Sequence, residues 1–179
     1  MSSVMMIDAR GIQKKFGAVT AAADVQIAIA HGERVSLIGS NGAGKTTFVN
    51  MLTGYIKPDA GEILLDGQSI TGLAPRQIAR LGVARSFQIP QLYKALSVQD
   101  NLLAAIAAQK SALSFWLPAK NAESIALAHE ILQRFDLLQH AERLVSELPG
   151  GVRKLLDIAM ALTRQPKVLL LDEPTSGVS

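Results

Sequence analysis

The sequence contains no cysteine, which excludes disulfides and thiolate metal sites. Aromatic residues are scarce at 4% while hydrophobic residues reach 49%, so the core must be mainly aliphatic. No apolar run approaches the ~20 residues of a membrane-spanning helix, and Asp8 and Arg10 interrupt the N-terminal stretch where a signal peptide would be apolar. Lysine and arginine form no cluster longer than a pair, so the net charge of +3 gives poor support for nucleic-acid binding. The composition of these 179 residues predicts one soluble, cytoplasmic domain that binds no nucleic acid.

The apolar pattern predicts strands at both ends of the chain with a helical block between them. Strands are expected at Val4–Asp8, Val19–Ala30, Arg34–Gly39, Glu62–Gly67, Gly82–Gln88 and Val168–Leu171. Helices are expected at Lys45–Leu52, Pro75–Leu81, Asn121–Asp136 and Val152–Thr163, with another that Ser97 caps and that runs through Leu102. This order favours an α/β core that carries a helical subdomain.

The stretch GSNGAGKT (Gly39–Thr46), here called the phosphate loop, matches G-x-x-x-x-G-K-[ST] between an expected strand and an expected helix. Its glycines let the backbone fold so that N–H groups surround a phosphate, and the following helix points its positive end at the same anion. Lys45 would add a charge at the β- and γ-phosphates, and Thr46 a hydroxyl for Mg²⁺. The alternative is a glycine-rich turn with an accidental lysine. We expect ATP and Mg²⁺ to be bound by Gly39, Ser40, Asn41, Gly42, Ala43, Gly44, Lys45, Thr46 and Thr47.

The chain ends in VLLLDEPTSGVS, an apolar strand followed by two carboxylates. On its own, such a pair is more often a solvated strand end. With the phosphate loop upstream, Asp172 is expected to reach Mg²⁺ through water, and Glu173 to polarise the attacking water.

Between these motifs, LPGGVRKLLDIAMAL (Leu148–Leu162) resembles the L-S-G-G-Q signature of ABC-type ATPases and the apolar helix that follows it. RSFQ (Arg85–Gln88) looks like the Q-loop of that family, and Phe16 sits where the family has an aromatic residue that stacks on adenine. Each piece is weak alone, but their order along nearly the whole chain is a strong signal.

The resemblance implies a single ABC ATPase domain with a P-loop NTPase (RecA-like) α/β core and N-terminal antiparallel strands. The core would comprise residues 1–90 and 165–179, and an inserted α-helical subdomain residues 91–164. The resemblance also implies that Gln88 is both catalytic and a Mg²⁺ ligand, beside Lys45 and Glu173. Gly150 and Gly151 would meet the nucleotide that a partner subunit holds.

Two residues depart from the signature: Pro149 replaces its serine and Val152 its glutamine. Proline has neither a hydroxyl nor an N–H, so the contacts that the family's serine makes are lost. Gly150 and Gly151 remain, and their backbone N–H groups could still meet a phosphate. In addition, no histidine follows the acidic pair, where the family carries its switch histidine. We expect a weakened signature.

The segment Gly82–Ala105 most resembles the ATP-binding subunits of branched-chain amino-acid importers, with the urea/amide type next. This implies a peripheral protein on the cytoplasmic side of the inner membrane, with membrane permease subunits as partners and a periplasmic binding protein as an indirect one. The poor signature favours a heterodimer with a second, different ATPase. Two other classes stay open: a nucleotide-binding module that no longer turns over, and a soluble ABC ATPase acting on DNA or ribosomes. The last predicts coiled-coil or basic insertions, which the sequence lacks.

The family's sheet has a further strand, which carries the switch histidine and lies between the strands expected at Arg34–Ile38 and Val168–Leu171. Without it these two strands would face an empty slot, each buried unpaired backbone group costing about 1–3 kcal/mol. We therefore expect the chain to be a C-terminally truncated ATPase, incomplete in its sheet, that alone binds nucleotide weakly and does not turn over.

Overall fold

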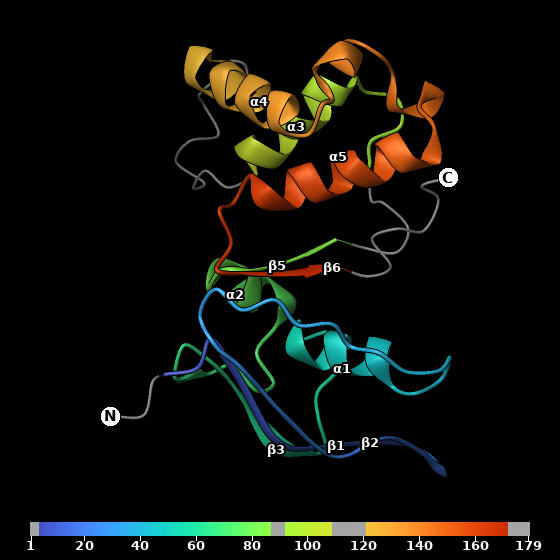
Figure 1. Cartoon of the computed structure of the whole chain (residues 1–179), viewed down its shortest axis with the longest axis vertical. Helices are drawn as coiled ribbons and strands as arrows, with labels where there is room; N and C mark the ends of the chain where they lie inside the picture. The colour runs from blue at the N-terminus through green and yellow to red at the C-terminus, as the bar shows by residue number, and fades with distance from the viewer. Residues whose placement is uncertain (1–3, 87–91, 109–120, 172–179) are drawn as a thin grey trace. The chain divides into compact units, whose positions relative to one another are not determined.

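The computed structural model describes residues 4–86, 92–108 and 121–171 (Figure 1). The chain divides into two compact units, Met1–Val83 and Ala84–Ser179. The first is built on strands and the second mainly on helices. The predicted division into a core of residues 1–90 and 165–179 and a subdomain of residues 91–164 stays a prediction.

The first unit holds a four-stranded sheet in the order β2-β1-β3-β4. Its strands are β1 (Ile7–Phe16), β2 (Val19–Ile29), β3 (Ala60–Leu65) and β4 (Gln68–Ser69). The central strand β1 runs antiparallel to both neighbours, which confirms the N-terminal antiparallel strands. It is longer than the strand expected at Val4–Asp8, because it pairs with β3 as far as Gln13 and with β2 as far as Phe16.

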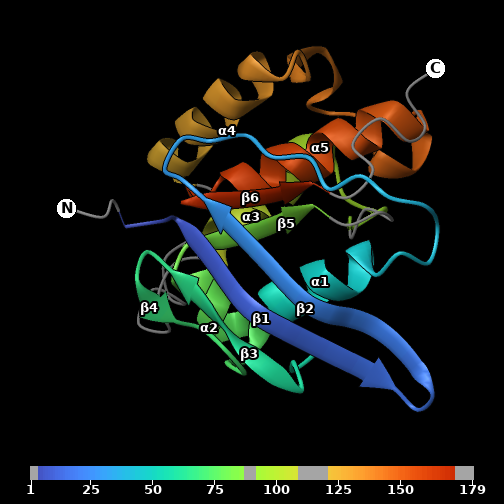
Figure 2. The ribbon, with the colours of Figure 1, turned by 60° about the horizontal axis from the view of Figure 1, so that its bottom comes forward.

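Helices α1 (Lys45–Leu52) and α2 (Pro75–Arg80) lie on one face of this sheet (Figures 1 and 2). The core between them is aliphatic apart from Phe48, as the composition requires. The apolar residues of β1 recur at Ile7, Ala9 and Ile12, and a register shift between the last two returns Ile12 to the buried face. Gly11 supplies the positive φ of 61° within that shift. The buried residues of this unit include Ile7, Ala9, Ile12, Phe48, Met51, Leu52, Ile63, Leu65, Ile70 and Ile78.

The prediction of a strand at Arg34–Gly39 is wrong. Residues 33–40 form neither helix nor strand, and the apolar side chains of Val35 (47% exposed), Leu37 (42%) and Ile38 (93%) face outward. A strand persists only where a neighbour pairs with its backbone, and none of the described strands pairs with this segment. The local apolar pattern was therefore not sufficient to form the strand.

Three helices of the second unit share one core: α3 (Val98–Ala107), α4 (Ala122–Arg134) and α5 (Gly150–Leu162). Two short 3-10 turns, η2 (Leu138–His140) and η3 (Val145–Glu147), join α4 to α5. The expected apolar face of α4 is buried at Ala128, Ile131 and Leu132. Helix α5 begins two residues earlier than expected, at Gly150.

Strands β5 (Val83–Ser86) and β6 (Val168–Leu171) pair with each other in a two-stranded sheet. Strand β6 has the bounds that its apolar run predicts. Within the described ranges, the structure contains no helix that is long and apolar enough to cross a membrane.

Candidate nucleotide-binding site

The phosphate loop depends on glycines at two positions in the left-handed region. Gly42 has φ 84° and Gly44 φ 83°, values that side-chain-bearing residues rarely adopt. Gly44 is also constrained by space, since a Cβ there would lie 2.1 Å from the carbonyl oxygen of Ala21 in β2. At Gly42 a Cβ would meet nothing within 4 Å. The loop is therefore anchored to the sheet at its Gly44 end and open at Gly42, as a cradle for an anion requires.

Lys45 folds back over the loop. Its Nζ donates to the carbonyl oxygens of Gly39 at 2.6 Å and Ser40 at 2.8 Å. These bonds hold the ammonium group beside the first two residues of the loop, although Lys45 itself is the first residue of α1. A phosphate in the loop would thus meet a positive charge that the chain already holds in place.

Helix α1 begins without a side-chain cap. Its N-cap is Gly44, no side chain accepts a hydrogen bond from its first N–H groups, and its first turn has no acidic residue. These N–H groups and the positive end of the helix dipole favour an anion. Thr46 is exposed in the same turn and Thr47 half-buried, so the hydroxyl of Thr46 is accessible to a Mg²⁺ ion. Loop, lysine and helix start together fit the triphosphate that the motif predicts.

Phe16 lies at the end of β1, where the chain turns into β2, and is 47% exposed. It pairs with Val19 across the hairpin, and Ala21, two residues farther along, is the residue whose carbonyl approaches Gly44. The start of α1 and the hairpin turn accordingly lie at the same end of the sheet (Figure 2). The structure thus brings together two predicted site elements that are separate in the sequence, the aromatic residue and the phosphate loop.

The signature segment starts α5. Pro149 is the N-cap, without a side-chain cap bond, and the first turn has no acidic residue. Gly150 is exposed, and a Cβ there would meet nothing within 4 Å. The chain therefore presents a second helix start that is open to an anion, and the loss of the side-chain cap expected from Pro149 is confirmed.

A buried polar pair of the second unit was not predicted from the sequence. The Ser86 hydroxyl donates to an Asp157 carboxylate oxygen at 2.7 Å, with both residues buried. The bond joins β5, whose last two residues begin the predicted Q-loop, to α5, whose first residues belong to the signature. The only sequence signal was an aspartate within the apolar run of α5.

Three predicted site residues, Gln88, Asp172 and Glu173, lie outside the described residues. Asp172 follows β6 directly, and Gln88 follows β5 by two residues. Elsewhere, in the part of the chain that the structure describes, no group of three or more His, Asp or Glu residues could hold a metal ion. The metal-binding and catalytic roles of these three residues stay predictions.

Comparison with known proteins decides the family. The family model described as "ABC transporter" matches residues 22–176, which include the phosphate loop, the signature segment and the terminal acidic pair. The chain belongs to the ABC transporter family. It is therefore an ATP-binding cassette with a P-loop NTPase fold, and ATPase is the activity of its family.

Several curated relatives share this assignment. The "high-affinity branched-chain amino acid transport ATP-binding protein LivG" of Escherichia coli K12 is 42% identical over 97% of this chain and 71% of its own length. BraF of Pseudomonas aeruginosa, with the same description, is 36% identical over 97% of this chain and 71% of its own length. A probable LivG of Methanocaldococcus jannaschii is 36% identical over 94% of this chain and 67% of its own length. All three relatives are longer than the region they share with this ABC cassette.

Solved structures agree on the fold. An ATP-binding cassette of an ABC transporter in its ADP conformation superposes with a TM-score of 0.85 at 34% identity, covering 99% of this chain and 72% of its own. A nucleotide-free cassette gives a TM-score of 0.83 at 34% identity, with 98% and 71% coverage. The α/β class expected from the sequence is confirmed.

Proposed function

We propose that this chain is the ATP-binding and ATP-hydrolysing subunit of an ABC importer for branched-chain amino acids. The observation that carries the proposal is the phosphate loop, with its two left-handed glycines, Lys45 and the open start of α1. The 42% identity to a branched-chain amino acid transport protein over 97% of the chain supports the substrate class. Urea or amide import is the alternative within the same family.

ATP and Mg²⁺ would be held by the residues that the sequence motifs predict. The backbone of Gly39–Thr47 and the Lys45 ammonium would bind the phosphates, and the Phe16 ring would stack on adenine. Thr46, Gln88 and Asp172 would hold Mg²⁺, which supplies charge neutralisation at the phosphate oxygens. Glu173 would accept a proton from the attacking water.

The proposed importer would also contain membrane permease subunits and a second ATPase subunit. The cassette would bind a membrane permease on its cytoplasmic side, and the permease would connect it indirectly to a periplasmic binding protein. Gly150 and Gly151, at the open start of α5, would face the nucleotide of a second ATPase subunit. Because Pro149 offers no hydroxyl, we propose a heterodimer in which that facing site is the slower one.

A second function, nucleotide binding without turnover, is favoured by one specific observation. Helix α5 has no side-chain cap at Pro149, where the family's serine would also contact the γ-phosphate. Loss of that contact would leave binding at the phosphate loop intact and would weaken hydrolysis.

The test is a measurement on the full-length protein. ATP affinity by calorimetry and Mg²⁺-dependent phosphate release should both be found, and phosphate release should rise when the permease subunits are present. In proteoliposomes that also contain the binding protein, ATP-driven uptake of leucine with no uptake of urea would support the substrate class. Binding without phosphate release under every condition would favour the second function, and absence of ATP binding would refute both.

A further inference from the structure

Next to Phe16, one lysine occupies a position that the motifs do not explain. The Lys14 Nζ lies over the Phe16 ring, 5.5 Å from its centroid. Its side chain is only 16% exposed, which is unusual for a lysine near a hairpin turn. A cation at this distance is attracted to the negative face of an aromatic ring.

Asp59 holds this lysine in place. One carboxylate oxygen of Asp59 accepts from the Lys14 Nζ at 2.7 Å, and the other accepts from the backbone N–H of Lys15 at 2.8 Å. The Asp59 N–H in turn donates to the Gln13 carbonyl oxygen at 2.8 Å. The hydrogen bond from Lys14, followed by the one from the Lys15 N–H, lowers the pKa of Asp59, so its carboxylate is ionised at neutral pH.

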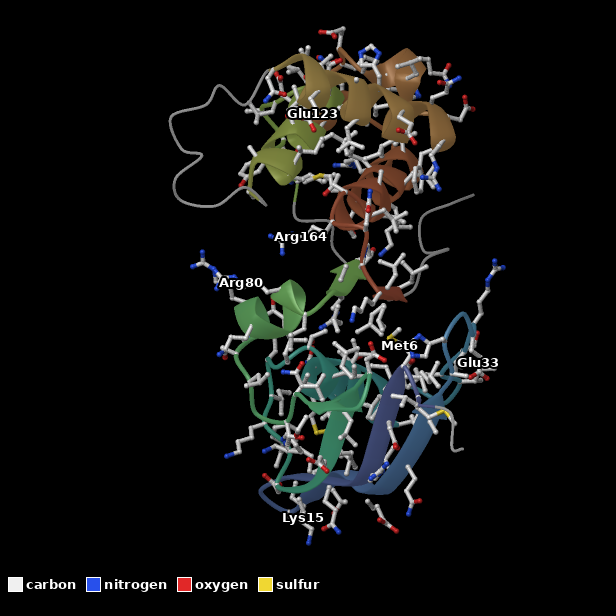
Figure 3. The ribbon with its side chains drawn as sticks, turned by 90° about the vertical axis from the view of Figure 1, so that its left-hand side faces the viewer. Met6, Lys15, Glu33, Arg80, Glu123 and Arg164 are labelled. Atoms are coloured by element: carbon white, nitrogen blue, oxygen red, sulfur yellow. The ribbon has the colours of Figure 1, made fainter. Side chains whose placement is uncertain are left out.

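These bonds fix the end of β1 at the residues directly before Phe16. Figure 3 labels Lys15 at this end of the sheet, opposite Met6 and Glu33. Both strands of the hairpin are therefore restrained near the turn. Asp59 restrains β1 through its hydrogen bond with Lys15, and the close packing of Gly44 against Ala21 restrains β2. With Lys14 over the ring and 47% of Phe16 exposed, the ring keeps a solvent-accessible surface in a restrained orientation.

We propose that Lys14, held by Asp59, is a positioning residue for nucleobase recognition: it fixes the Phe16 ring so that the exposed part of the ring can stack on the base. This rests on the proposed nucleotide site. Lys14 acts through Phe16 and not on the phosphates. Its removal therefore weakens the binding of a ligand with a base and leaves a base-free polyphosphate unaffected.

The experiment is a double-mutant cycle on the full-length protein. Lys14→Met removes the charge and keeps most of the stem, and Phe16→Ala removes the ring. Lys14→Met should weaken ATP binding roughly 2–5-fold, the value of an exposed cation–π contact. Phe16→Ala should weaken it roughly 5–150-fold, the value of one base stack. In the Phe16→Ala background, Lys14→Met should cause no further loss, because the two residues act as one unit.

Three controls make the result specific. Arg10→Met removes another cation of β1, one that is paired with Asp8, and should leave ATP affinity unchanged. Lys14→Arg should restore the affinity that Lys14→Met loses. Inorganic tripolyphosphate should bind the wild type and Lys14→Met equally. Thermal unfolding of each variant checks that the fold persists.

Failure of the Lys14 inference can be distinguished from failure of the proposed function. Equal weakening of ATP and tripolyphosphate by Lys14→Met would mean that the lysine attracts phosphate, and would overturn the inference. Unchanged ATP affinity in Lys14→Met, or additive losses in the double mutant, would also overturn it. A wild type that binds neither ATP nor tripolyphosphate would refute the proposed function itself.

Discussion

Helices α1 and α5 begin in the opposite way to helices α3 and α4. The Ser97 hydroxyl accepts from the Asp100 N–H at 3.1 Å at the start of α3, and the Asn121 side chain accepts from the Ser124 N–H at 2.8 Å at the start of α4. Each of these helices also has an acidic residue in its first turn. Helices α1 and α5 have neither a side-chain cap nor an acidic residue there.

Helices α1 and α5 therefore lack stabilising interactions that α3 and α4 have at their first turns. A cap is worth about 1 kcal/mol, and a first-turn carboxylate adds about 0.3–1 kcal/mol. Helices α3 and α4 have both. Helix α2 has neither, but the Gln77 side chain accepts from the Ala74 N–H at 2.9 Å at its start. Helices α1 and α5, which have neither, begin within the phosphate loop and the signature segment. An anion would provide at those two starts what Ser97 and Asn121 provide at α3 and α4.

The largest effects are expected from two substitutions, one that slows ATP hydrolysis and one that weakens ATP binding. Glu173→Gln should slow single-turnover hydrolysis about 10²–10⁴-fold, the value of a general base, with ATP affinity unchanged. Lys45→Ala should instead weaken ATP affinity about 10–100-fold, because it removes a charged partner of the phosphates. Affinity and single-turnover rate are measured for both variants. Equal loss of binding in the two would contradict the assigned roles.

A second prediction tests how the phosphate loop is held in place. Gly44→Ala should destabilise the fold by roughly 2–4 kcal/mol, since the residue has a positive φ and its Cβ would overlap the Ala21 carbonyl. Gly42→Ala is the matched control: it has the same φ sign but open space, and should cost only about 1–2 kcal/mol. Gly150→Ala, in α5 with open space around it, should cost nothing. Urea unfolding of the three variants gives the order, and a cost at Gly44 no greater than that at Gly42 would show that the approach to Ala21 is relaxed.

Substitution of the N-cap residues of α3 and α4 should change stability and leave ATP affinity unchanged. Ser97→Ala and Asn121→Ala should each lower the free energy of unfolding by about 1 kcal/mol, and replacement by glycine by only a few tenths. ATP affinity should stay unchanged in all four variants. A loss of ATP-binding free energy as large as the loss of unfolding free energy, in either alanine variant, would contradict the prediction. It would mean that the capped helix starts also affect nucleotide binding.

The sequence predicted those elements whose signal is local. Helix α1 has the predicted bounds because a motif fixes its start, and β6 because its apolar run is short and continuous. The strand expected at Arg34–Gly39 failed, since an apolar pattern does not supply a pairing partner. The bonds between Lys14 and Asp59 and between Ser86 and Asp157 were missed for a similar reason. The partners of the first bond are 45 positions apart in the sequence and those of the second are 71 positions apart. No motif links either pair.

The smallest effect should come from converting an open helix start into a capped one. Pro149 (φ −57°, ψ 154°) has nearly the backbone conformation of the N-cap Ser97 (φ −67°, ψ 165°), so serine fits at position 149 without a backbone change. Pro149→Ser should therefore add a cap to α5 and stabilise the fold by about 0.5–1 kcal/mol.

Pro149→Ser should also raise ATP turnover a few-fold in the assembled transporter, because in the proposed dimer the new hydroxyl would contact the phosphate of the facing nucleotide. The matched variant Pro149→Ala removes proline without adding a hydroxyl, and should do neither. Unfolding and steady-state phosphate release are measured for both. Equal gains in the two variants would attribute the effect to the loss of proline. A gain in stability without a gain in turnover would mean that the start of α5 does not meet a phosphate, and that its missing cap has no part in catalysis.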